Sequence, residues 1–283
     1  MNVREVLRQY GLHPSKGLGQ NFLTSESALW RIVEASNIGP LDTVIEIGPG
    51  LGQLTEELVQ RANQVVAIEL DRKMVAILDD RLGACDNLTV IQGDILETDL
   101  TDLVRQAGIE TTNGGAIRVV ANLPYYITSA AIRHVLESSL DLALITLMVQ
   151  REVAQRIVAK PGKMSLLAVS VQVYGTPELV HRVPAGAFYP QPKVDSAVLT
   201  IRPHPQPLVD KTLLPTFFRA VQYGFQQKRK QIHNSLGHGL SLGREQTMSL
   251  LLAAEIDPQR RPQTLTILEW GRLAAMIDAE PDA

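Results

Sequence analysis

Short apolar runs alternate with amphipathic stretches over the first half of the chain. The runs are rich in valine and isoleucine and predict buried strands at residues 43–47, 65–69, 88–92, 117–121 and 142–149. Between them, apolar residues at helical spacing predict helices at 25–35, 53–59, 72–82, 129–137 and 150–158. Strands that alternate with helices are typical of a doubly wound α/β fold with a mostly parallel sheet.

The pattern changes after residue 160. We expect a helix at 164–174 and then two strand-like runs, 178–183 and 196–202, which would form a hairpin with the last strand antiparallel. Proline at every second position of 203–207 predicts an extended linker, because it excludes both helix and sheet hydrogen bonds. The expected domains are therefore 1–203 and a C-terminal all-helical domain, 208–283. Its expected helices are 213–225, 228–236, 244–254 and 267–277.

The first predicted strand has an acid, Glu46, near its end. Three glycines follow at alternate positions, Gly48, Gly50 and Gly52. Glycine permits backbone conformations closed to other residues and allows a ligand to approach the main chain. A dinucleotide fingerprint would require a fourth glycine at position 53, where the chain has Gln53. The remaining pattern, E-x-G-x-G-x-G, is the one expected for S-adenosylmethionine. A tight turn without a ligand is the alternative.

Acidic residues end three successive predicted strands, at Glu46, Glu69 and Asp94. The carboxyl ends of parallel strands form one edge of the sheet, where open α/β sheets bind ligands. Glu69 is placed to accept both hydroxyl hydrogens of a ribose, and Asp94 to hold an adenine amino group. We interpret Asp71 as the cap of the helix at 72–82.

The tetrapeptide Asn122-Leu123-Pro124-Tyr125 follows the fourth predicted strand. The exocyclic nitrogen of adenine is a poor nucleophile because its lone pair is delocalised into the ring. If the Asn122 amide oxygen and the Leu123 carbonyl each accept one of its N–H groups, the nitrogen can pyramidalise toward a methyl group. Pro124 would fix the turn and Tyr125 would stack on the base. An ordinary turn with a core tyrosine remains the alternative for this motif alone.

Composition limits the class of protein. The 283 residues suffice for two domains, and a single cysteine, Cys85, excludes an internal disulfide. No apolar run approaches 18 residues, so we expect a soluble, cytoplasmic protein without membrane contact.

The net charge is −3, yet residues 211–283 carry 9 Lys/Arg against 7 Asp/Glu, with a cluster at Lys228, Arg229 and Lys230. That cluster suits phosphate contacts or a solvated helix face equally well. Residues 105–116 read as a surface loop to which we assign no role.

Several motifs together resemble the ribosomal RNA adenine dimethyltransferases, most closely the bacterial small-subunit (KsgA/RsmA) type. They are residues 20–23, 46–52, Glu69, 93–94, 122–126 and 188–196, in that order, and the resemblance covers nearly the whole chain. It implies a Rossmann-like class I S-adenosylmethionine-dependent methyltransferase that uses no metal. The implied substrate is a pair of adjacent adenosines in the 3′-terminal hairpin loop of small-subunit rRNA. Each would be dimethylated at N6 within an immature small subunit by a monomeric enzyme.

The resemblance also implies residue roles. Cofactor contacts would come from Asn21, Leu23, Gly48, Glu69, Asp94 and Asn122, and Phe188 would stack on the target adenine opposite Tyr125. Lys228, Arg229 and Lys230 match an rRNA-docking segment that usually has two arginines before the lysine, so Lys228 retains the charge without the guanidinium fork.

Three competing functions remain open at this point. They are a large-subunit rRNA adenine methyltransferase of the erythromycin-resistance type, a non-catalytic assembly or transcription factor on the same fold, and a nicotinamide dehydrogenase. A pI near 6.1 favours the small-subunit type over the first, because erythromycin-resistance enzymes usually have a more basic surface.

Overall fold

The computed structural model describes residues 2–15, 17–109 and 114–279 and divides into two compact units. The first unit contains residues 1–154 and 177–203, and the second contains 155–176 and 204–283. Residues 155–176, which the sequence pattern places with the sheet domain, thus pack with the C-terminal helices. Among the described residues, no helix is both long enough and apolar enough to cross a membrane.

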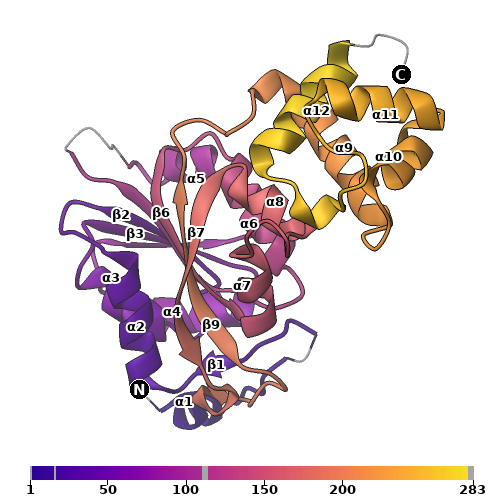
Figure 1. Cartoon of the computed structure of the whole chain (residues 1–283). Coiled ribbons are helices and arrows are strands. Elements are labelled where there is room, and N and C mark those ends of the chain that lie inside the picture. The colour runs from indigo at the N-terminus through magenta and orange to yellow at the C-terminus, as the bar shows by residue number, and fades with distance from the viewer. Residues whose placement is uncertain (1, 16, 110–113, 280–283) are drawn as a thin grey trace. The chain divides into compact units, whose positions relative to one another are not determined.

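A seven-stranded sheet forms the middle of the first unit, in the order β4-β3-β2-β5-β6-β9-β7 (Figure 1). The strands from β2 to β6 pair in parallel, and β9 runs antiparallel to β6, as the sequence pattern predicts for the last strand. The bounds are β2 Thr43–Ile47, β3 Gln64–Glu69, β4 Leu88–Gln92, β5 Ile117–Asn122, β6 Leu142–Gln150, β7 Gly175–Val183 and β9 Ser196–Pro203.

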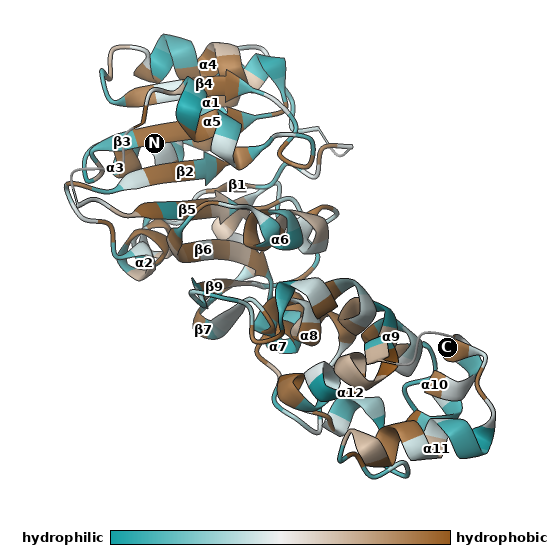
Figure 2. Ribbon diagram, turned by 90° about the horizontal axis from the view of Figure 1, so that it is seen from above, coloured by the Kyte–Doolittle hydropathy of each residue, from teal (hydrophilic) through white to brown (hydrophobic). Residues whose placement is uncertain are grey.

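Helices lie on both sides of this sheet, with α2 and α3 on one side and α5 and α6 on the other (Figure 1). The bounds are α1 Val3–Gln9, α2 Glu26–Ser36, α3 Gln53–Val59, α4 Arg72–Leu82, α5 Leu100–Gln106, α6 Thr128–Glu137 and α7 Arg151–Ile157. Every residue of β2 is buried, because β3 and β5 flank it and helices cover its faces. The hydrophobic colouring of β2, β3, β5 and β6 in Figure 2 reflects this double coverage.

A second, two-stranded sheet pairs segments that are far apart in the sequence. β1 (Phe22–Leu23) runs antiparallel to β8 (Phe188–Tyr189), with Leu23 opposite Phe188 and Phe22 opposite Tyr189. The sequence pattern suggests only loops here, because two residues are too few for a period-2 signal. Phe22, Leu23 and Phe188 are all buried, so this pairing fixes the N-terminal loop on the core.

Two expected elements differ from the structure. Helix α5 at Leu100–Gln106, capped by Asp99, covers the start of the segment expected as a loop, and residues 110–113 of that segment lie outside the described part. Helix α10 begins at Ile232, so the expectation of a helix from Lys228 is wrong. Residues 228–230 instead lie in an exposed turn after α9, which also removes the interpretation of this cluster as a helix face.

The second unit is mostly helical, as the sequence pattern of the C-terminal part predicts. Its elements are α8 Leu166–Gln172, α9 Leu214–Gln226, α10 Ile232–Leu240, α11 Arg244–Ala253 and α12 Ile267–Ala279. Trp270 of α12 is fully buried beside Gly224 of α9, where the ring would lie 2.4 Å from an added Cβ atom, so only glycine fits.

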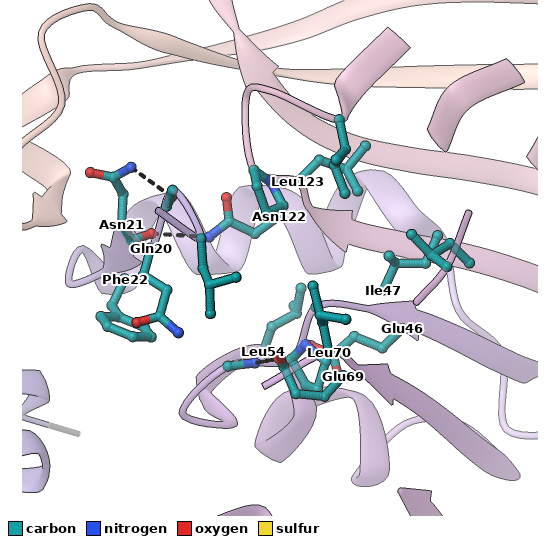
Figure 3. A pocket seen from close by; sticks show the side chains of 18 of the residues that line it. Gln20, Asn21, Phe22, Glu46, Ile47, Leu54, Glu69, Leu70, Asn122 and Leu123 are labelled. Carbon is teal, nitrogen blue, oxygen red and sulfur yellow. Dashed lines mark hydrogen bonds between the residues drawn. The ribbon is translucent and has the colours of Figure 1, made fainter. Parts of the chain in front are cut away.

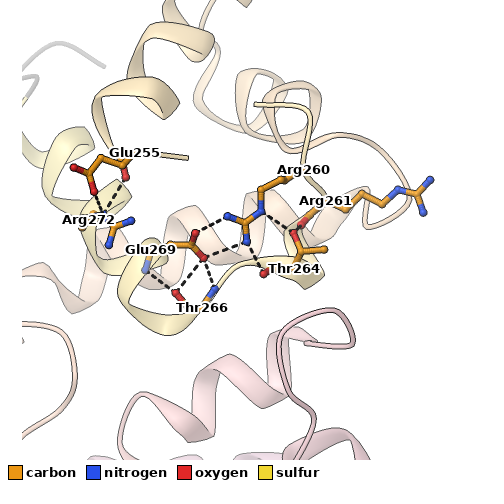
Figure 4. A network of polar contacts seen from close by, with 8 residues as sticks. Glu255, Arg260, Arg261, Thr264, Thr266, Glu269 and Arg272 are labelled. Carbon is orange, nitrogen blue, oxygen red and sulfur yellow. Dashed lines mark hydrogen bonds and ion pairs between the residues drawn. The ribbon is translucent and has the colours of Figure 1, made fainter. Parts of the chain in front are cut away.

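A polar network holds the turn that precedes α12 (Figure 4). Arg260 donates to both carboxylate oxygens of Glu269 at 2.5 and 3.2 Å and to the Thr264 carbonyl at 2.6 Å. Glu269 also accepts the backbone N–H of Thr266 at 2.7 Å. Arg260 therefore stabilises the turn and is not a free cation for a ligand.

Candidate active site

A partly open cleft of about 230 Å³ lies at the carboxyl edge of the parallel strands. Its lining comes from the ends of β2, β3 and β5, the segment after β4, the loop at 18–23 and Phe188. It includes all twelve residues that the sequence predicts for cofactor and adenine: Asn21, Leu23, Glu46, Gly48, Gly50, Glu69, Asp94, Asn122, Leu123, Pro124, Tyr125 and Phe188. Figure 3 shows how several of these side chains approach from separate elements.

The glycine turn has the backbone that its sequence predicts. Gly48, Gly50 and Gly52 have φ values of +70°, +57° and +85°, in the left-handed region that disfavours side chains. A Cβ atom at Gly50 would lie 3.3 Å from the Phe22 ring, so the turn and the N-terminal loop approach closely. At Gly48, which also lines the cleft, an added Cβ would have no neighbour closer than 4.0 Å, so the main chain there is accessible to a ligand.

Glu69 joins the end of β3 to the glycine turn. Its Oε2 accepts the N–H of Gly50 at 3.0 Å, and its Oε1 accepts the N–H of Asp71 at 2.8 Å. The side chain is only 7% exposed, and burial raises the pKa of this carboxyl, although the two N–H donors oppose the shift. Each oxygen has a second lone pair, so the carboxylate is oriented by the backbone and can still accept ligand hydroxyls.

Two further acids lie near Glu69 but have different surroundings. Asp71 caps α4 through its Oδ1, which accepts the N–H of Lys73 at 3.0 Å, as expected, and its Oδ2 accepts from the Gln20 amide at 2.9 Å. Asp94 is half-buried at the cleft, and its Oδ1 accepts the N–H of Leu96 at 2.9 Å. Asp71 is therefore a structural cap, whereas Asp94 lines the cleft.

Glu46 is the most deeply buried acid of the site. Its side chain is 1% exposed, and within the described residues its Oε2 has no hydrogen-bond partner. Burial raises its pKa to about 8, and the nearby carboxylate of Glu69 adds to the shift. A buried carboxyl oxygen without a hydrogen-bond partner is costly unless a ligand pairs with it. Glu46 is therefore suited to receive a cationic or hydrogen-bond-donating group.

The segment after β5 forms a turn held by several contacts. The Asn122 side-chain amide donates to the Asn21 carbonyl at 3.5 Å (Figure 3), and the N–H of Leu123 donates to the Met148 carbonyl at 3.2 Å. The Thr128 hydroxyl donates to the Pro124 carbonyl at 3.2 Å. Because the NH₂ end of Asn122 is used within the protein, its Oδ1 is the end left as an acceptor.

The loop at 18–23 and the segment around Phe188 are bound to each other. Thr24 donates to the Ala187 carbonyl through both its N–H, at 2.7 Å, and its hydroxyl, at 2.9 Å. Gln53 donates its side-chain amide to the Leu23 carbonyl. The position that departs from the dinucleotide fingerprint thus has a structural contact, which the glycine spacing alone does not predict.

Sequence comparison places the chain in a family. Residues 13–273 match the family described as ribosomal RNA adenine dimethylase. The chain belongs to this family. Two similar relatives, from Dehalococcoides mccartyi (strain CBDB1) and Moorella thermoacetica, are both 44% identical. The alignments cover 99% and 96% of this chain and 94% and 95% of the relatives, and each relative is named ribosomal RNA small subunit methyltransferase A.

Two solved structures resemble this dimethylase chain. The 23S rRNA methyltransferase ErmE is 28% identical with a TM-score of 0.68, covering 91% of this chain and 100% of its own. A dimethyladenosine transferase from Plasmodium falciparum is 22% identical with a TM-score of 0.75, covering 91% and 98%, and shows the shared fold. The protein is an S-adenosylmethionine-dependent enzyme with a class I methyltransferase fold. A nicotinamide dehydrogenase and a non-catalytic factor are thus excluded.

The cleft suits the methyl donor of this dimethylase family. S-adenosylmethionine carries a ribose, an adenine and a charged methionine end, and the cleft offers two buried carboxyls, a half-buried acid and an open main-chain turn. The unpartnered oxygen of Glu46 is the clearest sign that a polar ligand belongs there. Within the described residues, no group of three His, Cys, Asp or Glu side chains is arranged to hold a metal ion.

Proposed function

We propose that the enzyme dimethylates N6 of two adjacent adenosines in the 3′-terminal hairpin loop of small-subunit rRNA, within immature small subunits in the cytoplasm. Identities of 44% to small-subunit methyltransferases, against 28% to the 23S enzyme ErmE, support the small subunit over the large one. The convergence of the Asn122 turn, the glycine turn and Phe188 on one cleft carries the proposal.

The cofactor would lie along the edge of the sheet. Glu69, oriented by two backbone N–H groups, would accept the ribose hydroxyls. Asp94 would accept the adenine amino group, and the main chain at Gly48 and Gly50 would lie against the cofactor. Glu46 would pair with the ammonium of the methionine end, which supplies the partner that its buried carboxyl lacks. Asn21 and Leu23 would cover the cofactor from the N-terminal loop.

The target adenine would enter beside Asn122. Its amino hydrogens would be accepted by Asn122 Oδ1 and by the Leu123 carbonyl, so that the nitrogen lone pair turns out of the ring plane. When bound, S-adenosylmethionine would supply a methyl group on a sulfonium, and the bond from that methyl to sulfur would break as the bond to N6 forms. The sulfur would keep the electron pair of the broken bond and leave as S-adenosylhomocysteine, and N6 would release one of its protons to water. Pro124 limits the movement of the turn, because its ring fixes φ.

Two aromatic residues would form the walls for the base. Tyr125 and Phe188 both line the cleft but come from segments more than sixty residues apart. Stacking on aromatic faces holds an unpaired base without replacing the hydrogen bonds that select it. The selection of adenine therefore falls to the acceptors at Asn122 and Leu123, and the aromatic walls supply binding energy.

The helical unit would dock on rRNA. Lys228, Arg229 and Lys230 are exposed in the turn between α9 and α10, where their charges can reach a phosphate backbone. An exposed turn presents the three charges in more directions than one helix face would. Lys228 offers a point charge in place of a guanidinium fork, so contact there should depend on charge more than on geometry. A monomer suffices, since one chain contains both the cleft and this cluster.

One experiment tests the proposal directly. The protein is incubated with labelled S-adenosylmethionine and either small or large ribosomal subunits from cells that lack the corresponding methylation. Nucleosides are then analysed by mass spectrometry. We expect N6,N6-dimethyladenosine only with small subunits, at two adjacent positions near the 3′ end. Transfer to large subunits instead would support the erythromycin-resistance type and refute the proposal.

A further inference from the structure

The phenol of Tyr125 has a partner that the proposed chemistry does not use. Its hydroxyl lies 2.8 Å from Oγ of Ser196, the first residue of β9. Ser196 is fully buried and lies opposite Gln150 in the pairing of β9 with β6. A buried side chain on a strand that is paired on both sides moves little, so the hydrogen bond transmits the position of β9 to the Tyr125 ring.

Asp195, which precedes Ser196, holds the segment that carries Phe188, the second aromatic residue of the cleft. Asp195 Oδ1 accepts the N–H of Ala185 at 3.1 Å, and Ala185 begins the short helical turn that leads directly into Phe188. Asp195 Oδ2 accepts from Arg182 at 3.0 and 2.6 Å. The carbonyl of Asp195 also accepts the N–H of Arg151 at 2.9 Å, which fixes the start of β9 against the end of β6.

We propose that Asp195 and Ser196 are positioning residues that set the separation of the two aromatic walls, Ser196 through Tyr125 and Asp195 through the turn bearing Phe188. This inference rests on the proposed function, because it assumes that the target base binds between these rings. Neither residue touches the base. Each acts through hydrogen bonds to a wall, so the inference concerns the geometry of transfer and leaves cofactor affinity unaffected.

The two residues are adjacent in the chain, which gives the arrangement its rigidity. Ser196 contacts one wall and Asp195 the other, and a single peptide bond joins them. A change in the position of β9 would therefore displace both walls together. A well-oriented base reacts faster because its nitrogen stays aligned with the methyl group, and small displacements reduce rate steeply.

A double-mutant cycle tests the Ser196 half. The variants are Tyr125→Phe, Ser196→Ala and the double variant, assayed for transfer to immature small subunits at saturating S-adenosylmethionine. Each single change removes one partner of the same hydrogen bond, so each should lower kcat by roughly five- to thirty-fold. The double variant should be no slower than the single ones, because the bond is already lost. Cofactor affinity by calorimetry should stay within about twofold, since a lost positioning contact leaves the cofactor's own contacts intact.

Ser36→Ala is the matched control. Ser36 is also fully buried and donates a hydrogen bond, at 2.7 Å, but to the Ile32 carbonyl within α2. This variant should lose stability without a change in kcat, which separates a structural effect from positioning. If Ser196→Ala does not fold, Tyr125→Phe still tests the bond, since it removes only a hydroxyl group.

The Asp195 half is tested with Asp195→Ala. Asp99→Ala is its control, because the Asp99 carboxylate also accepts from the backbone, but its donors are the N–H groups of Thr101 and Asp102 in α5, which it caps. Asp195→Ala should lower kcat and raise the ratio of N6-monomethyladenosine to dimethyladenosine, whereas Asp99→Ala should change neither. An unchanged product ratio would refute the positioning role of Asp195.

The outcomes also separate this inference from the proposed function. If the wild-type protein transfers no methyl group to small subunits, the proposed function fails. If the wild type is active but the losses in Tyr125→Phe and Ser196→Ala multiply in the double variant, the positioning role fails and the function stands. A Ser196→Ala variant with the kcat of the wild type would refute the inference equally.

Discussion

Glu46 gives the sharpest test of how the cleft receives its cofactor. The change is Glu46→Gln, which keeps the size of the side chain and removes its ability to ionise. Burial raises the pKa of Glu46 to about 8 in the free protein. At pH 7 about nine in ten molecules then carry a protonated Glu46, and ionising it costs about 1.4 kcal/mol.

Binding of a cationic ammonium should reverse this preference. If the bound methionine end pairs with ionised Glu46, binding at pH 7 releases about 0.9 proton per cofactor bound. Between pH 6 and 7 the cofactor affinity of the wild type should therefore rise nearly tenfold. Glu46→Gln cannot ionise at this position, so its affinity should be weaker and should rise less with pH in this range, because Glu69 is then the remaining buried carboxyl of raised pKa.

Calorimetry in two buffers of different ionisation enthalpy measures the proton release directly. The difference between wild type and Glu46→Gln isolates Glu46, because burial raises the pKa of Glu69 as well. The same binding enthalpy of the wild type in both buffers would refute the reasoning. So would an equal dependence on buffer in the variant.

The free protein should show the matching effect on stability. The folded state binds more protons than the unfolded chain between the ordinary pKa of 4.5 and about 8, so the free energy of unfolding should fall as pH rises through this window. Glu46→Gln should lack the part of this decline that Glu46 contributes, which amounts to no more than roughly 5 kcal/mol. The part due to Glu69 should remain in both proteins. Urea unfolding at pH 5 and pH 8 measures both proteins.

Three further outcomes are expected. Glu69→Ala should weaken S-adenosylmethionine binding by roughly 1.5–3 kcal/mol through lost charge-assisted hydrogen bonds, and unchanged affinity by calorimetry would exclude the ribose role. Neutralising Lys228, Arg229 and Lys230 together should weaken small-subunit binding and flatten its salt dependence without affecting the cofactor; a constant salt slope in filter binding would contradict docking there. Asn122→Ala should abolish turnover even at saturating cofactor, whereas Asn122→Asp, which keeps an acceptor, should retain activity and accumulate N6-monomethyladenosine. Near wild-type dimethyladenosine from the alanine variant would refute the lone-pair mechanism.

The sequence predicts the sheet unit well because its signals are local. The strands β2 to β6 and the glycine turn follow from apolar runs and from glycine spacing, and their edge collects the acids that the strand ends predict. Three features escape local reasoning. The pairing of β1 with β8 joins Leu23 to Phe188 and Phe22 to Tyr189, which are 165 and 167 positions apart in the sequence. The Ser196 contact with Tyr125 depends on tertiary structure. The turn at 228–230 interrupts a segment whose local pattern predicts a helix.

The pairing of β1 with β8 has a thermodynamic consequence. The N-terminal loop at 18–23, which we propose covers the cofactor, and the segment that carries Phe188 share backbone hydrogen bonds. Ordering one of them therefore lowers the entropic cost of ordering the other. S-adenosylmethionine and the ribosomal subunit should then bind cooperatively. Linkage makes the effect reciprocal, so the factor by which the cofactor tightens subunit binding equals the factor by which the subunit tightens cofactor binding. An enzyme built this way retains its donor best when its substrate is already in place.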